Sequence, residues 1–386
     1  MKVLKIVIGT WKDDSRDKRE LSVYRELGAD VSVLAKGEPD DRGRLDEVDG
    51  FPVYRYSSRP LGSKVPNALN RVISIFTWAH FAGTLRPDVI TGHDISGLAI
   101  GWISGWFKKK KPKLIYDSHE FELGRNVKRG RAAFVLIKHA ERFLMRRCAY
   151  SIMVNDSIAD EVQRIHRLPE RPIVVRSTPD NWEIDEKACR ETRAEMLPPN
   201  AGEDGFLVMY HGMLTSLRGI EALIRLTAKN PRICAFSLGD GQPDFVEKLH
   251  ALASELGVED RVVFHPAVAL RDLWRYVGAA DLSLMMIEGK AKSYYFALPN
   301  KFFESIQSLT PIVASDFPEM KRIIDRYEIG LTCSPDDLDA INDCVEKMRT
   351  DTAFYAKCKS NLTRAKAELC WAKEKDVLIK AFKEIE

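Results

Sequence analysis

Polar side chains that can do chemistry stand directly after several strand-like runs of the sequence. His93 and Asp94 follow the run DVITG, and His119 lies in YDSHE, which follows KLI. A histidine at the end of a buried strand can hydrogen-bond a ligand hydroxyl or a developing charge, and its acidic neighbours Asp117 and Glu120 can hold its ring. We therefore predict that His119 is a catalytic residue rather than a structural one.

A second group of candidates lies in the run YHGMLTSLRGI. Gly212 lets the backbone approach a ligand closely, and Arg218 stands at the start of a helix, where a guanidinium and the helix N-terminus together can grip a diphosphate. The next strand-like run ends in SLGDGQP, a glycine turn with Gly239 and Asp240. Such turns are common in α/β proteins with and without nucleotides, so this signal is weak alone.

The segment LPNKFFES is the most specific of the candidates. Pro299 and Asn300 predict the start of a helix whose free backbone N–H groups can hold phosphate. Glu304 follows one turn later and can accept hydrogen bonds from both hydroxyls of a ribose. We predict that Leu298, Lys301 and these three residues bind the donor, although a helix with a solvated glutamate would explain this stretch taken alone.

Strand-like runs alternate with helix-length amphipathic segments, which is typical of parallel sheets covered by helices. The first series predicts strands at 3–8, 30–34, 88–91, 113–117 and 150–155, and the second at 206–211, 232–238, 261–265, 281–287, 311–314 and 329–333. Ligands of open α/β sheets bind at the carboxyl ends of the strands. The candidate residues would therefore lie on the binding edges of two sheets.

A polar segment with Pro179, Pro198 and Pro199 separates the two series and shows no strand period. We place a domain boundary there. The expected organisation is a first Rossmann-like domain at 1–175, a linker at 176–205, a second Rossmann-like domain at 206–365 and an amphipathic terminal helix at 366–386.

Composition limits the function classes. With 45% hydrophobic and 30% charged residues the chain is typical of globular proteins, and a net charge of +3 argues against general binding of nucleic acid. Segment 101–150 carries 13 Lys and Arg against 4 Asp and Glu, either as a solvated face or as a surface for anionic lipid or phosphate. Gly9 ends the first strand without a G-x-G-x-x-G motif, which argues against a dinucleotide-dependent dehydrogenase.

Three features bear on location and on metal sites. The seven cysteines are odd in number and form no C-x-x-C pair, so we expect neither a disulfide framework nor a zinc site. The amino terminus MKVLKIVIGT is interrupted by Lys5 and runs into charged residues, unlike a signal peptide, so we expect a cytoplasmic protein. The nearly uncharged run at 95–107 is shorter than the ~20 residues that span a bilayer.

Two segments, at 64–83 and 97–113, suit a membrane surface. They combine Trp78, Trp102, Trp106 and Phe107 with basic residues, a composition that can lie on an anionic membrane. The alternative is that both are buried covering helices followed by a lysine-rich loop. Peripheral attachment to the inner face of the membrane is therefore a second expectation beside the cytoplasm.

Taken together, these segments resemble family 4 of the retaining glycosyltransferases over nearly the whole chain. The resemblance rests on the order YDSHE, HG-x5-RG, GDG, LPNKFFE, TPIVASD and a terminal helix with a tryptophan. It implies the GT-B fold, an α/β architecture of two Rossmann-like domains whose parallel sheets face each other across a cleft. The first domain would hold the acceptor and the second the nucleotide sugar, and the terminal helix would cross back to the first.

The resemblance also implies roles for individual residues. His119 matches the family's histidine near the reacting centre, and Arg218 matches the basic residue on the diphosphate. Glu304 matches the second glutamate of the E-x7-E motif, which holds the ribose. Leu298 to Asn300 match the helix start beside the phosphates.

Three departures from the family pattern stand out. The first glutamate of E-x7-E is replaced by Phe296, the basic residue after the glycine of the second-domain first strand by Met213, and the glycine-rich amino-terminal loop is reduced to Gly9. The LPNKFFE version resembles a subgroup that lacks the first glutamate. Two alternatives remain open: a sugar-nucleotide-binding subunit without catalysis, and a sugar-nucleotide epimerase of the same fold.

The resemblance implies a mechanism without a metal or another cofactor. Arg218, Lys301 and helix N-termini would neutralise the departing nucleoside diphosphate. That phosphate would help to deprotonate the acceptor hydroxyl as it attacks the same face of the sugar, which would explain why no catalytic carboxylate pair is evident. The expected partners are a nucleotide sugar, a glycan or lipid-linked acceptor and an anionic membrane surface, but not nucleic acid.

Overall fold

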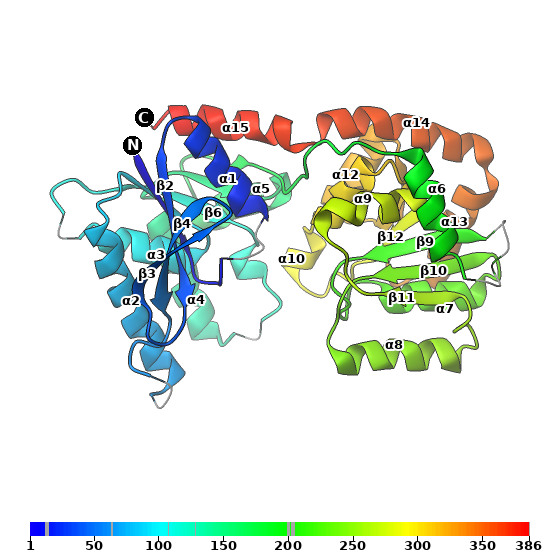
Figure 1. Cartoon of the computed structure of the whole chain (residues 1–386), viewed down its shortest axis with the longest axis horizontal. Coiled ribbons are helices and arrows are strands. Elements are labelled where there is room, and N and C mark those ends of the chain that lie inside the picture. The colour runs from blue at the N-terminus through cyan, green and yellow to red at the C-terminus, as the bar shows by residue number, and fades with distance from the viewer. Residues whose placement is uncertain are drawn as a thin grey trace. The chain divides into compact units, whose positions relative to one another are not determined.

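The chain divides into two compact units. The computed structural model describes residues 1–11, 15–62, 65–106, 108–127, 129–198, 201 and 205–385. Unit 1 comprises Met1–Arg176 and Glu374–Glu386, and unit 2 comprises Ser177–Lys373. Each unit consists of a sheet with helices packed on it (Figure 1). Pro199 and Phe107, which the sequence analysis singled out, lie outside the described residues.

Unit 1 contains an eight-stranded sheet in the order β3-β4-β2-β1-β5-β6-β7-β8. All neighbouring strands pair in parallel except β3 and β4, which form an antiparallel hairpin at one edge. The strands are β1 Lys2–Val7, β2 Asp30–Gly37, β3 Arg42–Val48, β4 Phe51–Ser57, β5 Val89–Gly92, β6 Lys113–Ser118, β7 Cys148–Met153 and β8 Ile173–Val174. Strands β3, β4 and β8 were not predicted from the sequence; β3 is polar and largely exposed, and β8 has only two residues.

The helices of unit 1 cover the sheet closely. They are α1 Ser15–Glu26, α2 Asn67–Thr84, α3 Ile95–Ser104, α4 Arg131–Met145 and α5 Asp156–His166, with a 3-10 turn at Glu122–Gly124. Helix α3 packs on β1, β5 and β6 and lies between α2 and α4. A Cβ atom on Gly97 would stand 2.8 Å from the carbonyl oxygen of Ile6, so a glycine allows this close approach.

The terminal helix α15 Trp371–Lys383 contributes to the core of unit 1 from Glu374 onward. The ring of Phe382 stacks on Tyr24 with a centroid distance of 4.3 Å, and both residues are buried. Glu374 accepts hydrogen bonds from the backbone and the guanidinium of Arg176. Both described ends of the chain therefore lie in unit 1 (Figure 1).

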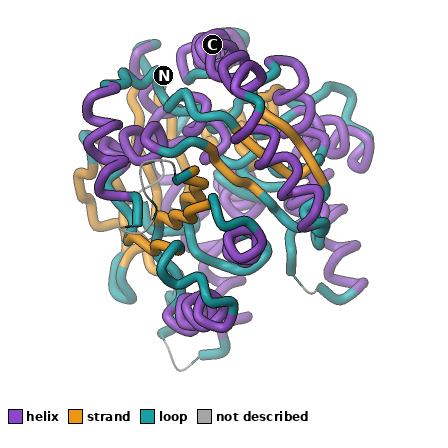
Figure 2. The backbone as a smooth tube through the Cα atoms, turned by 90° about the vertical axis from the view of Figure 1, so that its right-hand side faces the viewer, coloured by secondary structure: helices purple, strands orange, loops and turns teal. Residues whose placement is uncertain are grey.

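Unit 2 contains a six-stranded, fully parallel sheet in the order β11-β10-β9-β12-β13-β14. Its strands are β9 Phe206–His211, β10 Ile233–Leu238, β11 Val262–His265, β12 Leu282–Met285, β13 Ile312–Ser315 and β14 Gly330–Cys333. Alternate residues of β9 enter different cores: Val208 and Tyr210 pack in one, Leu207 and Met209 in the other. The sheet is therefore covered on both faces, and strands lie between helices in the tube view (Figure 2).

The described helices of unit 2 include one inside the predicted linker at 176–205. Helix α6 Glu186–Met196 is capped by Asp185 and packs on α9. The others are α7 Ile220–Lys229, α8 Pro243–Glu255, α9 Leu270–Ala279, α10 Lys292–Tyr295, α11 Asn300–Gln307, α12 Pro318–Tyr327, α13 Leu338–Thr350 and α14 Thr352–Glu368. The predicted α/β architecture with two parallel sheets is confirmed. Among the described residues, no helix has both the length and the apolarity needed to cross a bilayer.

Candidate functional site

A buried charge cluster occupies the carboxyl-terminal edge of the sheet in unit 1. Lys5, in the middle of β1, is fully buried. Its Nζ lies 2.7 Å from Asp17, 2.5 Å from Glu20 and 3.1 Å from Asp117. Because a buried ammonium requires compensating charges, Lys5 ties helix α1 to the ends of β1 and β6.

His119 lies on top of this cluster, directly after β6. Its Nε2 is 2.9 Å from Asp117 and 3.2 Å from Asp17, and the side chain is 19% exposed. Burial alone would lower the pKa of His119, but the two carboxylates outweigh it and raise the pKa to about 9. At neutral pH His119 is therefore an imidazolium, which donates hydrogen bonds and cannot act as a base.

The neighbours of His119 differ in part from those predicted. Asp117 holds the ring as expected, but Glu120 pairs with Arg125 at 2.8 Å. The second carboxylate is Asp17 of α1, which the sequence analysis did not select. Lys5 and His119 together hold the pKa of Asp17 well below its usual range, although burial acts in the opposite direction.

His93 joins the same cluster from the end of β5. Its Nδ1 lies 2.8 Å from Asp17, and its ring centroid is 3.9 Å from that of His119. Asp94 caps helix α3 by accepting a hydrogen bond from the backbone N–H of Gly97 at 2.8 Å. Asp94 therefore has a structural task, while His93 stands beside the candidate catalytic residue.

The cluster also contains groupings of possible metal ligands. Asp17, His93 and His119 offer ligand atoms within 4.8 Å of one another. A metal ion requires an unprotonated imidazole, whereas His119 is protonated at neutral pH. Lys5 already neutralises Asp17. The chemistry of these residues therefore suits hydrogen bonding to a polar organic ligand better than binding of a divalent cation.

In unit 2 a pocket of about 330 Å³ lies at the carboxyl ends of β9 and β10. It brings together four of the predicted donor-binding residues, Gly212, Gly239, Asp240 and Glu304. Several of the other residues that line it were not predicted as donor-binding residues. These are His211, Leu238, Ala267, Val268 and Leu273.

Two glycines shape this pocket. A Cβ atom on Gly239 would lie 2.0 Å from the carbonyl oxygen of Gly212, and the φ angles of Gly239 and Gly212 are +151° and +113°. Both positions therefore require glycine. Asp240 has a scaffolding task, because its carboxylate accepts a hydrogen bond from the backbone N–H of Ala267 at 3.1 Å and so fixes the far wall.

Glu304 projects from α11 to the edge of the same pocket. Its side chain is 15% exposed, and Oε2 lies 3.1 Å from Nε2 of His211. No described residue bonds Oε1, so this oxygen can accept hydrogen bonds from a ligand. The pairing with His211 orients the carboxylate that the sequence analysis predicted.

Lys301 is a buried lysine that forms no ion pair with any described carboxylate. Its Nζ lies 3.8 Å above the ring of Tyr210 and has no hydrogen-bond partner among the described residues. Burial, together with the charge of Arg218 and against that of Glu304, lowers the pKa of Lys301 to about 7. An ammonium in this environment is stabilised by an incoming anion.

Arg218 adds a second unpaired cation. It precedes α7, stands 5.1 Å from the ring of Tyr294 and forms no ion pair with any described carboxylate. Helix α7 begins after Gly219 and α11 after Pro299, and neither of these residues makes a side-chain cap. Two cations and two helix starts without side-chain caps are features that suit the binding of an anion.

The remaining predicted positions have simpler environments. Leu298 is buried in the core, Pro299 precedes α11 and Asn300 is exposed in its first turn. Gly9, in unit 1, is exposed, and a Cβ atom there would approach nothing closer than 3.9 Å, so nothing in its surroundings requires a glycine.

Family models match both units of the chain. Residues 21–179 match the glycosyl transferase 4-like domain, and residues 205–351 match the glycosyl transferases group 1 model. The chain belongs to the family 4 glycosyltransferases. The roles of the individual candidate residues in this glycosyltransferase stay predictions.

Curated relatives share parts of this sequence. The chain is similar to the alpha-D-kanosaminyltransferase of Streptomyces kanamyceticus, with 25% identity over 232 residues, which are 58% of each protein. It is also similar to the lipopolysaccharide core biosynthesis glycosyltransferase LpsE of Rhizobium meliloti, with 28% identity over 40% of this chain and 42% of the relative. The chain thus matches about half the length of these relatives.

Solved structures match the whole chain. Anabaena HepE in complex with UDP has a TM-score of 0.78 at 16% identity, with both chains fully covered. Sucrose-phosphate synthase from Thermosynechococcus elongatus has a TM-score of 0.79 at 16% identity and covers all of this chain and 98% of its own. The predicted GT-B fold of this glycosyltransferase is therefore confirmed.

The unpaired charge of Lys301 predicts a pH-dependent effect on stability. Below pH 7 the lysine is protonated in both the folded and the unfolded chain, so the full destabilisation of a buried cation is present. In the unfolded chain the lysine has its ordinary pKa of 10.5. As the pH rises from about 7 toward that value, the unfolded chain therefore binds more protons than the folded chain, and the destabilisation disappears. Lys301→Met should therefore increase the free energy of unfolding more at pH 6 than at pH 9, as measured by urea denaturation.

The control for this prediction is Lys187→Met, because the Lys187 side chain is 78% exposed. It should change stability little at either pH. An equal gain or loss for Lys301→Met at both pH values would contradict a lowered pKa.

The two carboxylates predict the titration of His119. An NMR titration should give His119 a pKa of about 9. Asp17→Asn should lower this pKa, because it removes one of the two charges that raise it. Glu120→Gln is the matched control, since Glu120 pairs with Arg125 instead. A pKa that responds to Glu120→Gln and not to Asp17→Asn would contradict the geometry.

Proposed function

We propose that this chain is a retaining glycosyltransferase that moves a sugar from a nucleotide-diphosphate sugar to an acceptor hydroxyl in cell-surface glycan or glycolipid biosynthesis. The observation that carries the proposal is the pair of unneutralised cations, Arg218 and Lys301, at the starts of α7 and α11. A diphosphate supplies the negative charge that this pair lacks.

The neighbouring groups of unit 2 fit the remaining parts of a nucleotide. The pocket of about 330 Å³ has apolar walls from Val268 and Leu273, which suit a nucleobase. The free oxygen of Glu304 suits the ribose hydroxyls, and the backbone around Gly212 is open for close approach. The solved structures of Anabaena HepE with UDP and with UDP-glucose support a uridine nucleotide as the donor.

The proposed reaction needs charge stabilisation rather than a strong acid. The acceptor oxygen bonds to the anomeric carbon, the bond from that carbon to the diphosphate oxygen breaks, and the hydroxyl proton passes to the leaving phosphate. Arg218 and Lys301 stabilise the charge on the leaving group, so no metal ion or other cofactor takes part. His119, as an imidazolium, would donate a hydrogen bond to a hydroxyl of the donor sugar and so orient it for the attack.

The departures from the family pattern leave this chemistry intact. Phe296 is half-buried beside Tyr295, and Met213 is 74% exposed. Both side chains are uncharged, so neither replaces the charge of the family residue. We infer that the chain is of a subgroup in which Lys301 and Glu304 of LPNKFFE act without the first glutamate. The names of the kanosaminyltransferase and LpsE relatives support a saccharide acceptor of the glycan or lipopolysaccharide type.

The test begins with a thermal-shift screen of nucleoside diphosphates and nucleotide sugars, since selective binding raises stability. With the selected donor, the parent should release nucleoside diphosphate in the presence or absence of EDTA. His119→Ala should lower the rate on the order of 100-fold with little change in donor dissociation constant, because its contact strengthens in the transition state. His250→Ala, an exposed histidine of α8, is the control.

The same assay separates the alternatives. Donor binding without release of nucleoside diphosphate would point to a binding subunit. A changed sugar that is still attached to its nucleotide would point to an epimerase. Near-parent turnover by a folded His119→Ala protein would make the histidine structural.

We further propose that an apolar and basic surface of unit 1 lies on an anionic membrane. Leu69, Val72 and Phe76 form an exposed stripe along α2 at helical spacing. Phe76 contacts Trp106 with a centroid distance of 6.4 Å, and Trp106 contacts Trp102, which links the stripe to α3. Four exposed lysines, Lys108 to Lys111, follow on the next loop. Apolar side chains beside cations suit a membrane with anionic lipids.

The buried-helix alternative holds for Trp78, which is 2% exposed and packs in the core, but not for the α2 stripe. Replacing Lys108 to Lys111 with serine should therefore reduce co-sedimentation with vesicles that contain phosphatidylserine, since each lysine contributes on the order of 1 kcal/mol. The matched control replaces exposed lysines of unit 2 with serine: Lys187, Lys290, Lys321 and Lys357. Equal loss in both variants, or no binding by the parent, would contradict the membrane assignment.

A further inference from the structure

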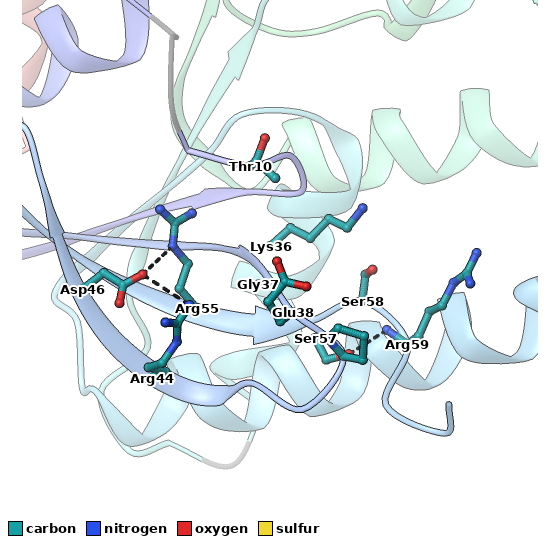
Figure 3. Close-up of a pocket in the computed structure, with 11 residues that line it drawn as sticks. Thr10, Lys36, Gly37, Glu38, Arg44, Asp46, Arg55, Ser57, Ser58 and Arg59 are labelled. Carbon is teal, nitrogen blue, oxygen red and sulfur yellow. Dashed lines mark hydrogen bonds and ion pairs between the residues drawn. The ribbon is translucent and has the colours of Figure 1, made fainter. Parts of the chain in front are cut away.

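A second, larger pocket lies in unit 1, at the carboxyl ends of β2 and β4. Its volume is about 530 Å³, and the loop after β1 and the edge strand β3 complete its walls (Figure 3). Four cationic side chains and two acidic ones line it. The charge cluster around His119 does not include any of its lining residues, so it is a separate cavity.

Two of the cations, Arg55 and Arg44, form one wall of the pocket and pair with a shared carboxylate. Arg55 is only 8% exposed and bonds Asp46 at 3.1 Å. Arg44 lies 3.5 Å from the same carboxylate and 2.9 Å from Asp41. The dashed contacts in Figure 3 show both arginines converging on Asp46. These charges are balanced locally, so the wall provides shape and oriented N–H groups rather than net charge.

The other two cations, Lys36 and Arg59, are exposed and form no ion pair with any described carboxylate. Their backbones are nevertheless fixed. The N–H of Lys36 donates to the carbonyl oxygen of Gly9 at 3.0 Å, and the N–H of Arg59 donates to Oγ of Ser57 at 3.0 Å. Figure 3 shows both side chains extending toward the same side of the pocket, with the hydroxyl of Ser58 between them.

Glu38 supplies the one acidic group of the lining without a described cationic partner. Its backbone N–H bonds Asp41 at 2.7 Å, which fixes the loop. Gly37 makes this loop geometry feasible, since a Cβ atom there would lie 2.3 Å from the Asp41 carboxylate and 2.8 Å from Cβ of Arg55. A carboxylate beside two cations can accept hydrogen bonds from hydroxyls that adjoin an anionic group.

The strand order places this pocket near the histidines. β2 and β5 are the two neighbours of β1, and all three strands run parallel, so their carboxyl ends lie on one edge. Two strand spacings separate the end of β2, with Lys36, from the end of β5, with His93, which is about 10 Å. A ligand anchored in the pocket can therefore extend along the edge toward His93 and His119.

We propose that this pocket binds the anionic group, a phosphate monoester or a carboxylate, of a saccharide acceptor. Lys36 and Arg59 bind the anion, and Glu38 and Ser58 bind adjoining hydroxyls. The proposal rests on the proposed glycosyltransferase function and names its acceptor class as an anionic sugar. Two unpaired cations near a single free carboxylate favour one charged group on a sugar over a polyanion such as nucleic acid.

The test compares three ligands that share one sugar: glucose, glucose 6-phosphate and glucuronic acid. Binding is measured by calorimetry without donor, so the result does not depend on turnover. The parent should bind at least one charged sugar more tightly than glucose, and the preferred one identifies the anion as phosphate or carboxylate. The double variant Lys36→Met, Arg59→Met should weaken that binding by at least about 10-fold, because two charge-assisted hydrogen bonds are lost.

The matched control, Lys2→Met with Arg131→Met, removes two exposed cations of unit 1 outside the pocket, Lys2 being at the opposite end of β1. It should bind as the parent does. Equal binding of glucose and the charged sugars by the parent, or unchanged binding by the pocket variant, would overturn the proposal. Inorganic phosphate that binds as tightly as glucose 6-phosphate would overturn its saccharide part.

Release of nucleoside diphosphate by the parent protein is assayed separately and decides the glycosyltransferase function by itself. Loss of charged-sugar preference with intact donor turnover would therefore remove only the acceptor assignment. Preferential binding of a charged sugar without release of nucleoside diphosphate would show an anionic-sugar site in a chain without transferase activity. The role of that sugar as an acceptor would then be overturned. A folded state of each variant is checked by its unfolding midpoint, and Lys36→Glu with Arg59→Glu provides a second variant that should lose binding completely.

Discussion

The burial of Lys5 constrains much of unit 1. An ammonium inside a parallel strand is tolerated only with compensating charge, and three carboxylates surround it. Two of these, Asp17 and Asp117, also bond His119. The cation that anchors helix α1 to the sheet thus fixes the groups that set the protonation and orientation of the candidate catalytic histidine. Removing Lys5 would take away the ammonium that three buried carboxylates share, which is strongly destabilising.

Unit 2 shows the opposite arrangement. Lys301 is buried like Lys5, yet no described group accepts a hydrogen bond from its Nζ. The pKa of Lys301 falls to about 7. A folded chain retains such a destabilised group where its function requires it, because an incoming anion replaces the missing charge. The paired cluster of unit 1 keeps His119 in one protonation state, whereas Lys301 of unit 2 would change its protonation if an anion bound beside it.

The sequence predicted the elements with strong apolar patterns and the residues at their ends. The strands of unit 2 lie within two residues of their predicted ends, because they are buried on both faces. The hairpin β3–β4 was missed because polar β3 has no apolar period. Lys5 was noticed only as an interruption of an apolar run, although a lysine inside such a strand itself indicates a buried carboxylate partner.

Other features depend on tertiary contacts and leave no local pattern. Asp17 meets His119 through the packing of α1, and neither residue's surroundings in the sequence indicate this pairing. Ala267 and Val268 line the pocket of unit 2 as two small apolar residues in a loop, which carry no chemical signal. Lys301 was selected for its position in LPNKFFE, but its lack of a described hydrogen-bond partner follows from the way α11 packs beside Tyr210.

The charge balance of unit 2 bears on the end of the proposed reaction as well as its start. A nucleoside diphosphate carries more negative charge than the nucleotide sugar from which it forms, so Arg218 and Lys301 should hold the product more tightly than the donor. A permanently charged pair would then slow product release. Because the pKa of Lys301 lies near 7 without an anion, the lysine can lose its proton as the product departs, so the free site does not retain a second full charge. In the proposed reaction, the burial that destabilises Lys301 would therefore limit the affinity for the product and still allow the lysine to be charged as the leaving group forms.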